Sequence, residues 1–127
     1  MVLLDTNILI GFWKQNPVLQ RELQAIGEAN FCISSVTEAE LLVGARNTQD
    51  LVFIRRKLAQ LPVVPIEPAI CELMAELLVR FVLSHRLAMA DALIAATALH
   101  HDLPLYTLNL KDFRYIPGLR LHQPAAA

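Results

Sequence analysis

Short apolar runs alternate with longer segments of helical periodicity along almost the whole of this chain. The apolar runs read "MVLL", "FCIS", "VVPI", "LYTL" and "LRLH". They are continuous rather than alternating in polarity, which is typical of strands that are covered on both faces. Strands separated by helices indicate βαβ units. The pattern therefore predicts an α/β protein of three layers (α/β/α), with a central parallel β-sheet of about five strands.

Length and composition predict a single domain. The chain has 127 residues, of which 55% are hydrophobic, and this combination favours a sizeable core over disorder. Its most apolar window, "LMAELLVRFVL", is too short for a membrane span and contains Glu76 and Arg80. We expect neither a membrane span nor a signal peptide, and hence a cytoplasmic location. Residues 1–122 form the predicted domain, and residues 123–127 are interpreted as a flexible tail or a cloning scar.

The charge balance limits the kinds of partner. Eleven Lys and Arg residues face 12 Asp and Glu residues, a formal net charge of -1. This excludes a broad non-specific nucleic-acid coat, so a nucleic-acid contact has to come from a local basic rim. The basic cluster Arg55, Arg56 and Lys57 is typical of a solvated helix face, with RNA contact as the alternative. The high apolar fraction suggests that a partner covers part of the surface.

Asp5 interrupts the apolar start of the chain, "MVLLDTNILI". A lone carboxylate in such a run is costly unless it is paired, hydrated or bound to a cation. Ligands of parallel α/β folds sit beyond the carboxyl ends of the strands, which is where Asp5 falls. The alternative is an aspartate that caps the next helix.

Glu40 follows the second apolar run, in "SSVTEAELLVGA". Two capping boxes fit this stretch, Ser35 with Glu38 and Thr37 with Glu40, and they cannot both cap one helix start. With Ser35 as the cap, Glu40 is left free. It then shares a helix face with Gly44 one turn later, where the missing side chain leaves room for a ligand.

Two further acidic residues come from the second half of the chain. Asp91 lies in "AMADALIAATAL", a helix that is apolar nearly all round and therefore buried. The alternative for Asp91 is a buried ion pair with Arg86. Asp112 follows the fourth apolar run in "YTLNLKDF", and its alternatives are a turn cap or a pair with Lys111 or Arg114.

The fold would bring Asp5, Glu40, Asp91 and Asp112 to one rim. Clustered carboxylates raise one another's pKa unless a cation neutralises them. Oxygen ligands without His or Cys favour Mg²⁺ or Mn²⁺ over zinc. We therefore expect these four residues to bind Mg²⁺ or Mn²⁺. The sequence "HHD" at 100–102 lacks metal-ligand spacing and is typical of a helix C-terminus.

The sequence resembles the PIN-domain ribonucleases, specifically VapC-type toxins of toxin–antitoxin pairs. The resemblance rests on "LLDTNILI", "SSVTEAELLVGA", "ADALIAATAL" and "TLNLKDF", which occur in family order across residues 1–122. It implies a PIN-like fold and a ligand set that matches the rim derived above. The family's acidic site maps to Asp5, Glu40, Asp91 and Asp112, and its supporting polar residues map to Thr6, Thr107 and Asn109.

The resemblance implies a metal-dependent endoribonuclease toxin that cuts single-stranded or loop RNA. It further implies a cognate antitoxin, which would meet the chain near Phe12 and Trp13. The 55% hydrophobic content of so small a chain predicts a homodimer. A metal-activated water would then hydrolyse the phosphodiester. Two alternatives stay open: a catalytically silent binding module that acts through a protein partner, and a phosphatase with Asp5 as nucleophile. The phosphatase would usually want a second acid two residues on, where this chain has Asn7.

Overall fold

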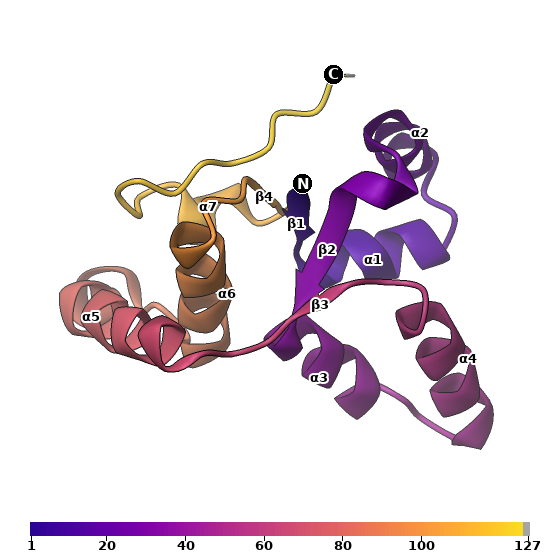
Figure 1. Ribbon diagram of the computed structural model, residues 1–127, viewed down its shortest axis with the longest axis horizontal. Helices are drawn as coiled ribbons and strands as arrows, with labels where there is room; N and C mark the ends of the chain where they lie inside the picture. Colours follow the sequence, from indigo (N-terminus) through magenta and orange to yellow (C-terminus); the bar gives the residue numbers. More distant parts are fainter. Residues whose placement is uncertain (126–127) are drawn as a thin grey trace.

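The computed structural model describes residues 1–125. Ala126 and Ala127, which belong to the predicted tail, lie outside the described residues. Twelve elements follow one another along the described chain, with a 3₁₀ turn, η1, among them (Figure 1). In chain order they are β1 (Val2–Leu4), α1 (Thr6–Trp13), α2 (Pro17–Ile26), η1 (Glu28–Asn30), β2 (Phe31–Ser34), α3 (Ser35–Val43), α4 (Thr48–Leu58), β3 (Val63–Val64), α5 (Pro68–His85), α6 (Met89–His100), β4 (Leu105–Tyr106) and α7 (Leu110–Phe113).

The four strands form one parallel sheet in the order β3-β2-β1-β4. The prediction of about five parallel strands is close, and the difference lies in "LRLH". This segment makes a single parallel bridge, Leu121 with Leu105, rather than a strand. Two backbone hydrogen bonds hold it beside β4, from Leu105 N–H to the Arg120 carbonyl and from His122 N–H to the Leu105 carbonyl. The last apolar run therefore extends the sheet edge by one residue pair.

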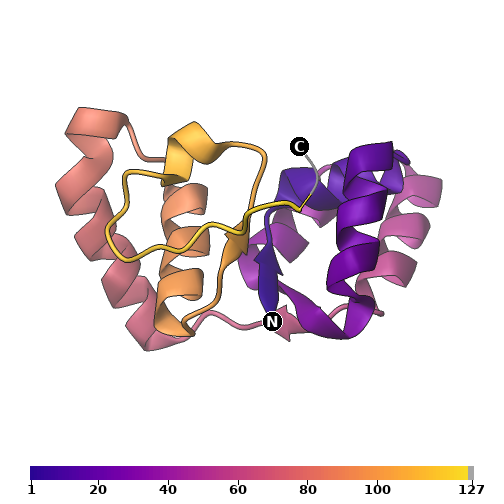
Figure 2. The same ribbon diagram turned by 90° about the horizontal axis from the view of Figure 1, so that it is seen from above.

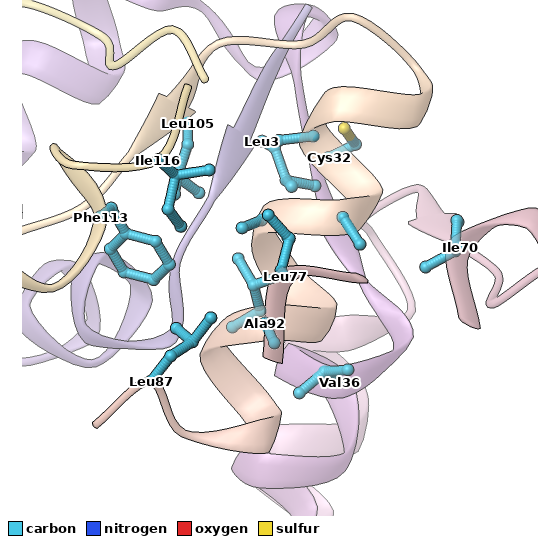
Figure 3. Packing of buried hydrophobic residues seen from close by; sticks show 14 residues of the cluster. Leu3, Cys32, Val36, Ile70, Leu77, Leu87, Ala92, Leu105, Phe113 and Ile116 are labelled. Carbon is cyan, nitrogen blue, oxygen red and sulfur yellow. The ribbon is translucent and has the colours of Figure 1, made fainter. Parts of the chain in front are cut away.

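Helices cover both faces of the sheet, which confirms the three-layer prediction (Figure 1). Successive strand residues point to opposite faces. Leu3 accordingly packs in the core cluster beside α5 and α6, whereas Leu4 packs in the cluster beside α1, α2 and α4. Figure 3 shows Leu3, Leu77, Ala92 and Phe113 in the first of these clusters. Strands with two buried faces need apolar residues at every position, which explains the continuous runs.

One edge of the molecule collects the ends of several elements. The arrows of β1 and β4 point to the same edge, and α7 and the start of α6 lie there too (Figure 2). The chain leaves β1 directly into α1 and β2 directly into α3. Residues that follow different strands in the sequence thus meet at the carboxyl edge of the sheet, as parallel topology requires.

The C-terminal segment crosses back over the molecule to α2. Glu22 of α2 is buried, with Oε1 at 2.8 Å from His122 Nε2 and Oε2 accepting the Ala125 backbone N–H at 3.1 Å. The end of the described chain is thereby tied to the first half of the domain. No helix described between residues 1 and 125 combines the length and the hydropathy of a membrane span.

Candidate functional site

Asp5 directly follows β1 and is the N-cap of α1. Its side chain is buried, and both of its oxygens are hydrogen-bonded. Oδ1 accepts the Thr6 backbone N–H at 2.8 Å, and Oδ2 accepts the Thr107 hydroxyl at 2.7 Å. Burial raises the pKa of Asp5, and the two hydrogen bonds work against this rise. The helix-cap alternative thus accounts for one oxygen, while the other is held by a residue that follows β4.

Glu40 lies in the second turn of α3 and contacts the start of α1. Its Oε1 accepts the Thr6 hydroxyl at 2.7 Å, and that hydroxyl also lies 3.2 Å from the Thr37 hydroxyl. Neither predicted capping box forms, because the helix begins one residue earlier than expected. Ser34 is the N-cap, and its hydroxyl accepts the Thr37 backbone N–H at 3.1 Å. Glu40 is therefore free of the helix start, although for a different reason from the one predicted.

Asp91 lies half-buried in the first turn of α6. Burial, and then the negative charges of Asp5, Asp112 and Glu40, raise its pKa to about 6. No salt bridge connects Asp91 with Arg86 within residues 1–125, so the ion-pair alternative is wrong. Arg86 instead ends α5 with its backbone in the left-handed region, which carries the chain on towards α6. Asp91 consequently carries a charge that its surroundings disfavour.

Asp112 is an exposed residue of the short helix α7. The cap position of this helix belongs to Asn109, and within the described chain Asp112 forms no salt bridge with Lys111 or Arg114. The Asn109 backbone N–H donates to the Thr107 hydroxyl at 3.0 Å, which orients that hydroxyl towards Asp5. The predicted alternatives for Asp112, a turn cap or an ion pair, are thus not found.

The four carboxylates act on one another through space. The charges of Glu40 and Asp112 raise the pKa of Asp5, and those of Asp5, Glu40 and Asp112 raise the pKa of Asp91. No lysine or arginine contributes to either effect. Neighbouring carboxylates without a positive partner attract a cation, and their oxygen ligands suit Mg²⁺ or Mn²⁺. The donor set at this edge therefore fits the predicted metal.

A second group of ligand-type side chains lies at the opposite end of α6. Glu67 Oε2 is 3.5 Å from His100 Nε2, and Glu67 Oε1 is 3.2 Å from His101 Nε2. Within residues 1–125 this is the one group of three whose donor atoms all lie within 4.8 Å of one another. The four carboxylates of the edge are more widely spread. Sequence reasoning did not predict that Glu67 lies beside His100 and His101, because it precedes His100 by 33 residues and no local motif connects them.

Tyr115 is a site neighbour that sequence reasoning also missed. Tyr115 lines a small hollow together with Asp91 and Asp112. Burial raises the pKa of its phenol first, and the charges of these two carboxylates raise it further. Its ring stacks on the ring of His85 with centroids 3.8 Å apart. The available signal was weak: a tyrosine three residues after Asp112, next to the segment already implicated.

Known proteins share this architecture. Residues 2–119 match the family described as the PIN domain. Ribonuclease VapC10 of Mycobacterium tuberculosis is 35% identical over 94% of this chain and 91% of its own length. The tRNA(fMet)-specific endonuclease VapC of Shigella flexneri is 30% identical over 93% of each protein. A solved chain from a toxin–antitoxin complex of Klebsiella pneumoniae is 34% identical and superimposes with a TM-score of 0.79, covering 94% of this chain and 95% of that one. Since these matches span nearly the full length, the chain belongs to the PIN domain family and, within it, to the VapC-type members.

Proposed function

We propose that this protein is a metal-dependent endoribonuclease, the toxin of a toxin–antitoxin pair. One observation carries the proposal: Asp5 and Asp91, buried and half-buried, lie beside Glu40 and Asp112, and no Lys or Arg within residues 1–125 forms a salt bridge with Asp5 or Asp91. Such an arrangement costs free energy in the metal-free protein, which is expected where ligand binding recovers it. The names of the relatives, a ribonuclease and a tRNA-specific endonuclease, supply the reaction class.

The carboxylates of Asp5, Glu40, Asp91 and Asp112 would hold Mg²⁺ or Mn²⁺. When bound, the ion supplies charge neutralisation at phosphorus and a more acidic water. The remaining residues position these ligands. Thr107 and the Thr6 backbone N–H fix both oxygens of Asp5, and the Thr6 hydroxyl holds Glu40. Because these donors leave lone pairs on every carboxylate, the carboxylates are oriented and can still bind a metal ion.

Asp5 is poorly suited to the alternative role of a phosphatase nucleophile. It is 5% exposed, and both of its oxygens already accept hydrogen bonds. A nucleophilic oxygen has to approach phosphorus directly, whereas a metal ligand needs only one free lone pair. We therefore favour the hydrolysis of RNA by water. With an RNA substrate we propose a cytoplasmic location.

An antitoxin segment would fit the cavity between α1, α3 and α4. This cavity of about 460 Å³ has apolar walls from Ile10, Trp13 and Phe53, and Glu40 lies at its rim. Trp13 is half-buried there, edge-on to Phe53 at 5.9 Å between ring centroids. An amphipathic helix with an arginine or lysine at the Glu40 end would fill the walls and place a cation beside the carboxylates. Such a cation would inhibit by competing with the metal.

Self-association of the protein is proposed from the outer face of α5. Val79 is 82% exposed and Leu83 is 94% exposed, one turn apart on the same face. Two such faces packed together would bury the apolar surface that the composition led us to expect. Solution mass by light scattering, for the protein and for Leu83→Glu, tests this. A monomer at all concentrations would refute the dimer.

The activity is tested with purified, antitoxin-free protein and a labelled structured RNA. We expect cleavage in Mg²⁺ or Mn²⁺, none in chelator, and a loss of at least 100-fold in Glu40→Gln. Glu72→Gln, an exposed carboxylate of α5, is the matched control and should cut normally. Equal cleavage in chelator would refute the metal dependence. If the protein binds an antitoxin but leaves the RNA intact under every metal condition, the result would favour the catalytically silent binding module.

A further inference from the structure

A hollow with a basic wall adjoins the acidic edge. It has a volume of about 390 Å³ and is lined by Ser84 and His85 from the end of α5, by Arg86, and by Lys111, Asp112, Arg114 and Tyr115 from the region of α7. A smaller hollow of about 230 Å³ continues from it to Asp91 and shares His85, Arg86, Asp112 and Tyr115 with it. The two together form a passage from three cationic side chains to the proposed metal ligands.

The three cations of this hollow are available for a ligand. Arg86, Lys111 and Arg114 are exposed, and none of them takes part in a salt bridge within the described residues. Basic side chains this close to a group of carboxylates would be expected to pair with them. Instead they line the hollow, where these three cations face a single carboxylate, that of Asp112, so an anion can bind.

Arg86 occupies a position where arginine is unusual. As the C-cap of α5 it has φ 53°, in the left-handed region that favours glycine or asparagine. An L-residue with a long side chain pays about 1 kcal/mol for this conformation. Strain of this kind persists at functional sites when the side chain is needed there. The backbone turn at Arg86 directs the chain towards α6, and Arg86 lines both the larger hollow and the smaller one that reaches Asp91.

The opposite wall of the hollow is aromatic and well supported. The His85 and Tyr115 rings are stacked, 13° from parallel, and Phe81 packs edge-on against both at 5.6 and 5.0 Å between centroids. The Ser84 hydroxyl lies 2.8 Å from His85 Nδ1, which fixes the imidazole further. Flat rings beside cations are the surface on which single-stranded nucleic acids bind, since bases stack while phosphates meet the charges.

We propose that this hollow binds the RNA strand next to the scissile bond, with a backbone phosphate on Arg86 and Arg114 and a base against the His85–Tyr115 wall. The inference rests on the proposed ribonuclease function and names how that site takes its substrate. An acidic edge by itself repels a polyanion. Cations placed along the passage offset that repulsion and lead one phosphate towards the metal ligands. The net charge of -1 is compatible with this, because only a local rim is needed.

The test compares Arg86→Gln and Arg114→Gln with Arg21→Gln, an exposed arginine of α2 outside the hollow that undergoes the same change of charge. Binding of a labelled single-stranded RNA is measured in chelator over a range of salt concentrations, and cleavage is measured in Mg²⁺. We expect each hollow variant to bind about 10-fold more weakly, with a salt slope smaller by about 0.7. The loss in cleavage should appear in KM rather than kcat, and thermal stabilisation by Mg²⁺ should be unchanged. Arg21→Gln should match the unchanged protein.

The results separate this inference from the proposed function. If the hollow variants bind and cut RNA as Arg21→Gln does, the inference is overturned, whereas the proposed ribonuclease activity is not affected. If the unchanged protein binds RNA through Arg86 and Arg114 but does not cut it, the inference is supported and the proposed nuclease activity is refuted. If Arg86→Gln fails to fold by circular dichroism, Arg114→Gln decides, because Arg114 lies on the surface after α7 and carries no strained backbone.

Discussion

Replacing Asp91 by asparagine should stabilise the metal-free protein. In the unfolded chain Asp91 titrates near 3.8, whereas in the folded protein burial and its acidic neighbours raise its pKa to about 6. Between these two values the folded state binds more protons than the unfolded state, so stability falls as the pH rises. The full cost is present above about pH 6 and absent below about pH 4. Asparagine cannot ionise and is nearly isosteric, so the variant avoids this cost.

The magnitude follows from the change in pKa. A rise from 3.8 to about 6 corresponds to about 3 kcal/mol at 1.36 kcal/mol per tenfold change. Because Asp91 is only half-buried, solvent screening reduces this to about 1–2 kcal/mol. For a chain of this length such a gain raises the melting temperature by about 4–7 °C. A mutation that removes a proposed catalytic residue is thus expected to make the protein more stable, not less.

Thermal unfolding in chelator measures this directly. At neutral pH the melting temperature of Asp91→Asn should exceed that of the unchanged protein, and at about pH 4 the two should coincide. Added Mg²⁺ should stabilise the unchanged protein, by about 2.7 kcal/mol at 100 times Kd, and the variant far less. Glu72→Gln, exposed on α5, serves as the control and should show neither effect. A metal-free Asp91→Asn that is less stable than the unchanged protein at neutral pH would refute the reasoning, because it would mean that a partner compensates the Asp91 charge.

Three further predictions concern the contacts that hold the site and the domain together. Thr107→Val removes the hydroxyl that donates to Asp5 and should cost about 1–3 kcal/mol in urea unfolding, since a buried carboxylate loses a partner; an unchanged midpoint would contradict this. Ser34→Ala removes the cap of α3 and should cost about 1 kcal/mol in the same assay, whereas Ser34→Gly should cost only a few tenths, and equal losses would argue against the cap. His122→Ala leaves the buried Glu22 without its imidazole partner and should speed amide exchange in α2 and near the C-terminus, while exchange in α5 should stay as it is; a uniform change would contradict a local tie.

The layers of the fold could be predicted because they depend on side-chain period and length. A strand buried on both faces needs apolar residues at every position, and Leu3 and Leu4 show this by packing on opposite sides of the sheet. The strand lengths could not be predicted in the same way. Strand pairing ends where the neighbouring strand no longer runs alongside. For this reason "LYTL" contributes two strand residues and "LRLH" contributes a single bridge. Thr107 follows β4, and its hydroxyl donates a hydrogen bond to Asp5 at the site.

The positions of the carboxylates could be predicted from strand ends, but their partners could not. Asp5 and Asp112 each follow a strand of a parallel sheet, and that topology places them at one edge. The hydroxyl that donates to Asp5 belongs to Thr107, 102 residues away in the sequence. The hydroxyl that donates to Glu40 belongs to Thr6, 34 residues away. The cap of α3 was misplaced by one residue because three neighbouring hydroxyl residues, Ser34, Ser35 and Thr37, fit the same local rule.

By itself the sequence determined the alternation of strands and helices, the cover on both faces of the sheet and the identity of the acidic residues. These depend on the polarity and spacing of near neighbours, which are visible in the chain. The tertiary structure alone decided that Asp91 forms no salt bridge among residues 1–125, that Tyr115 lines a hollow with it, and that Arg86 and Arg114 share one hollow. The physical reason is that charge and contact act through space. Packing of α5, α6 and α7 sets those distances, and no local pattern in the sequence encodes them.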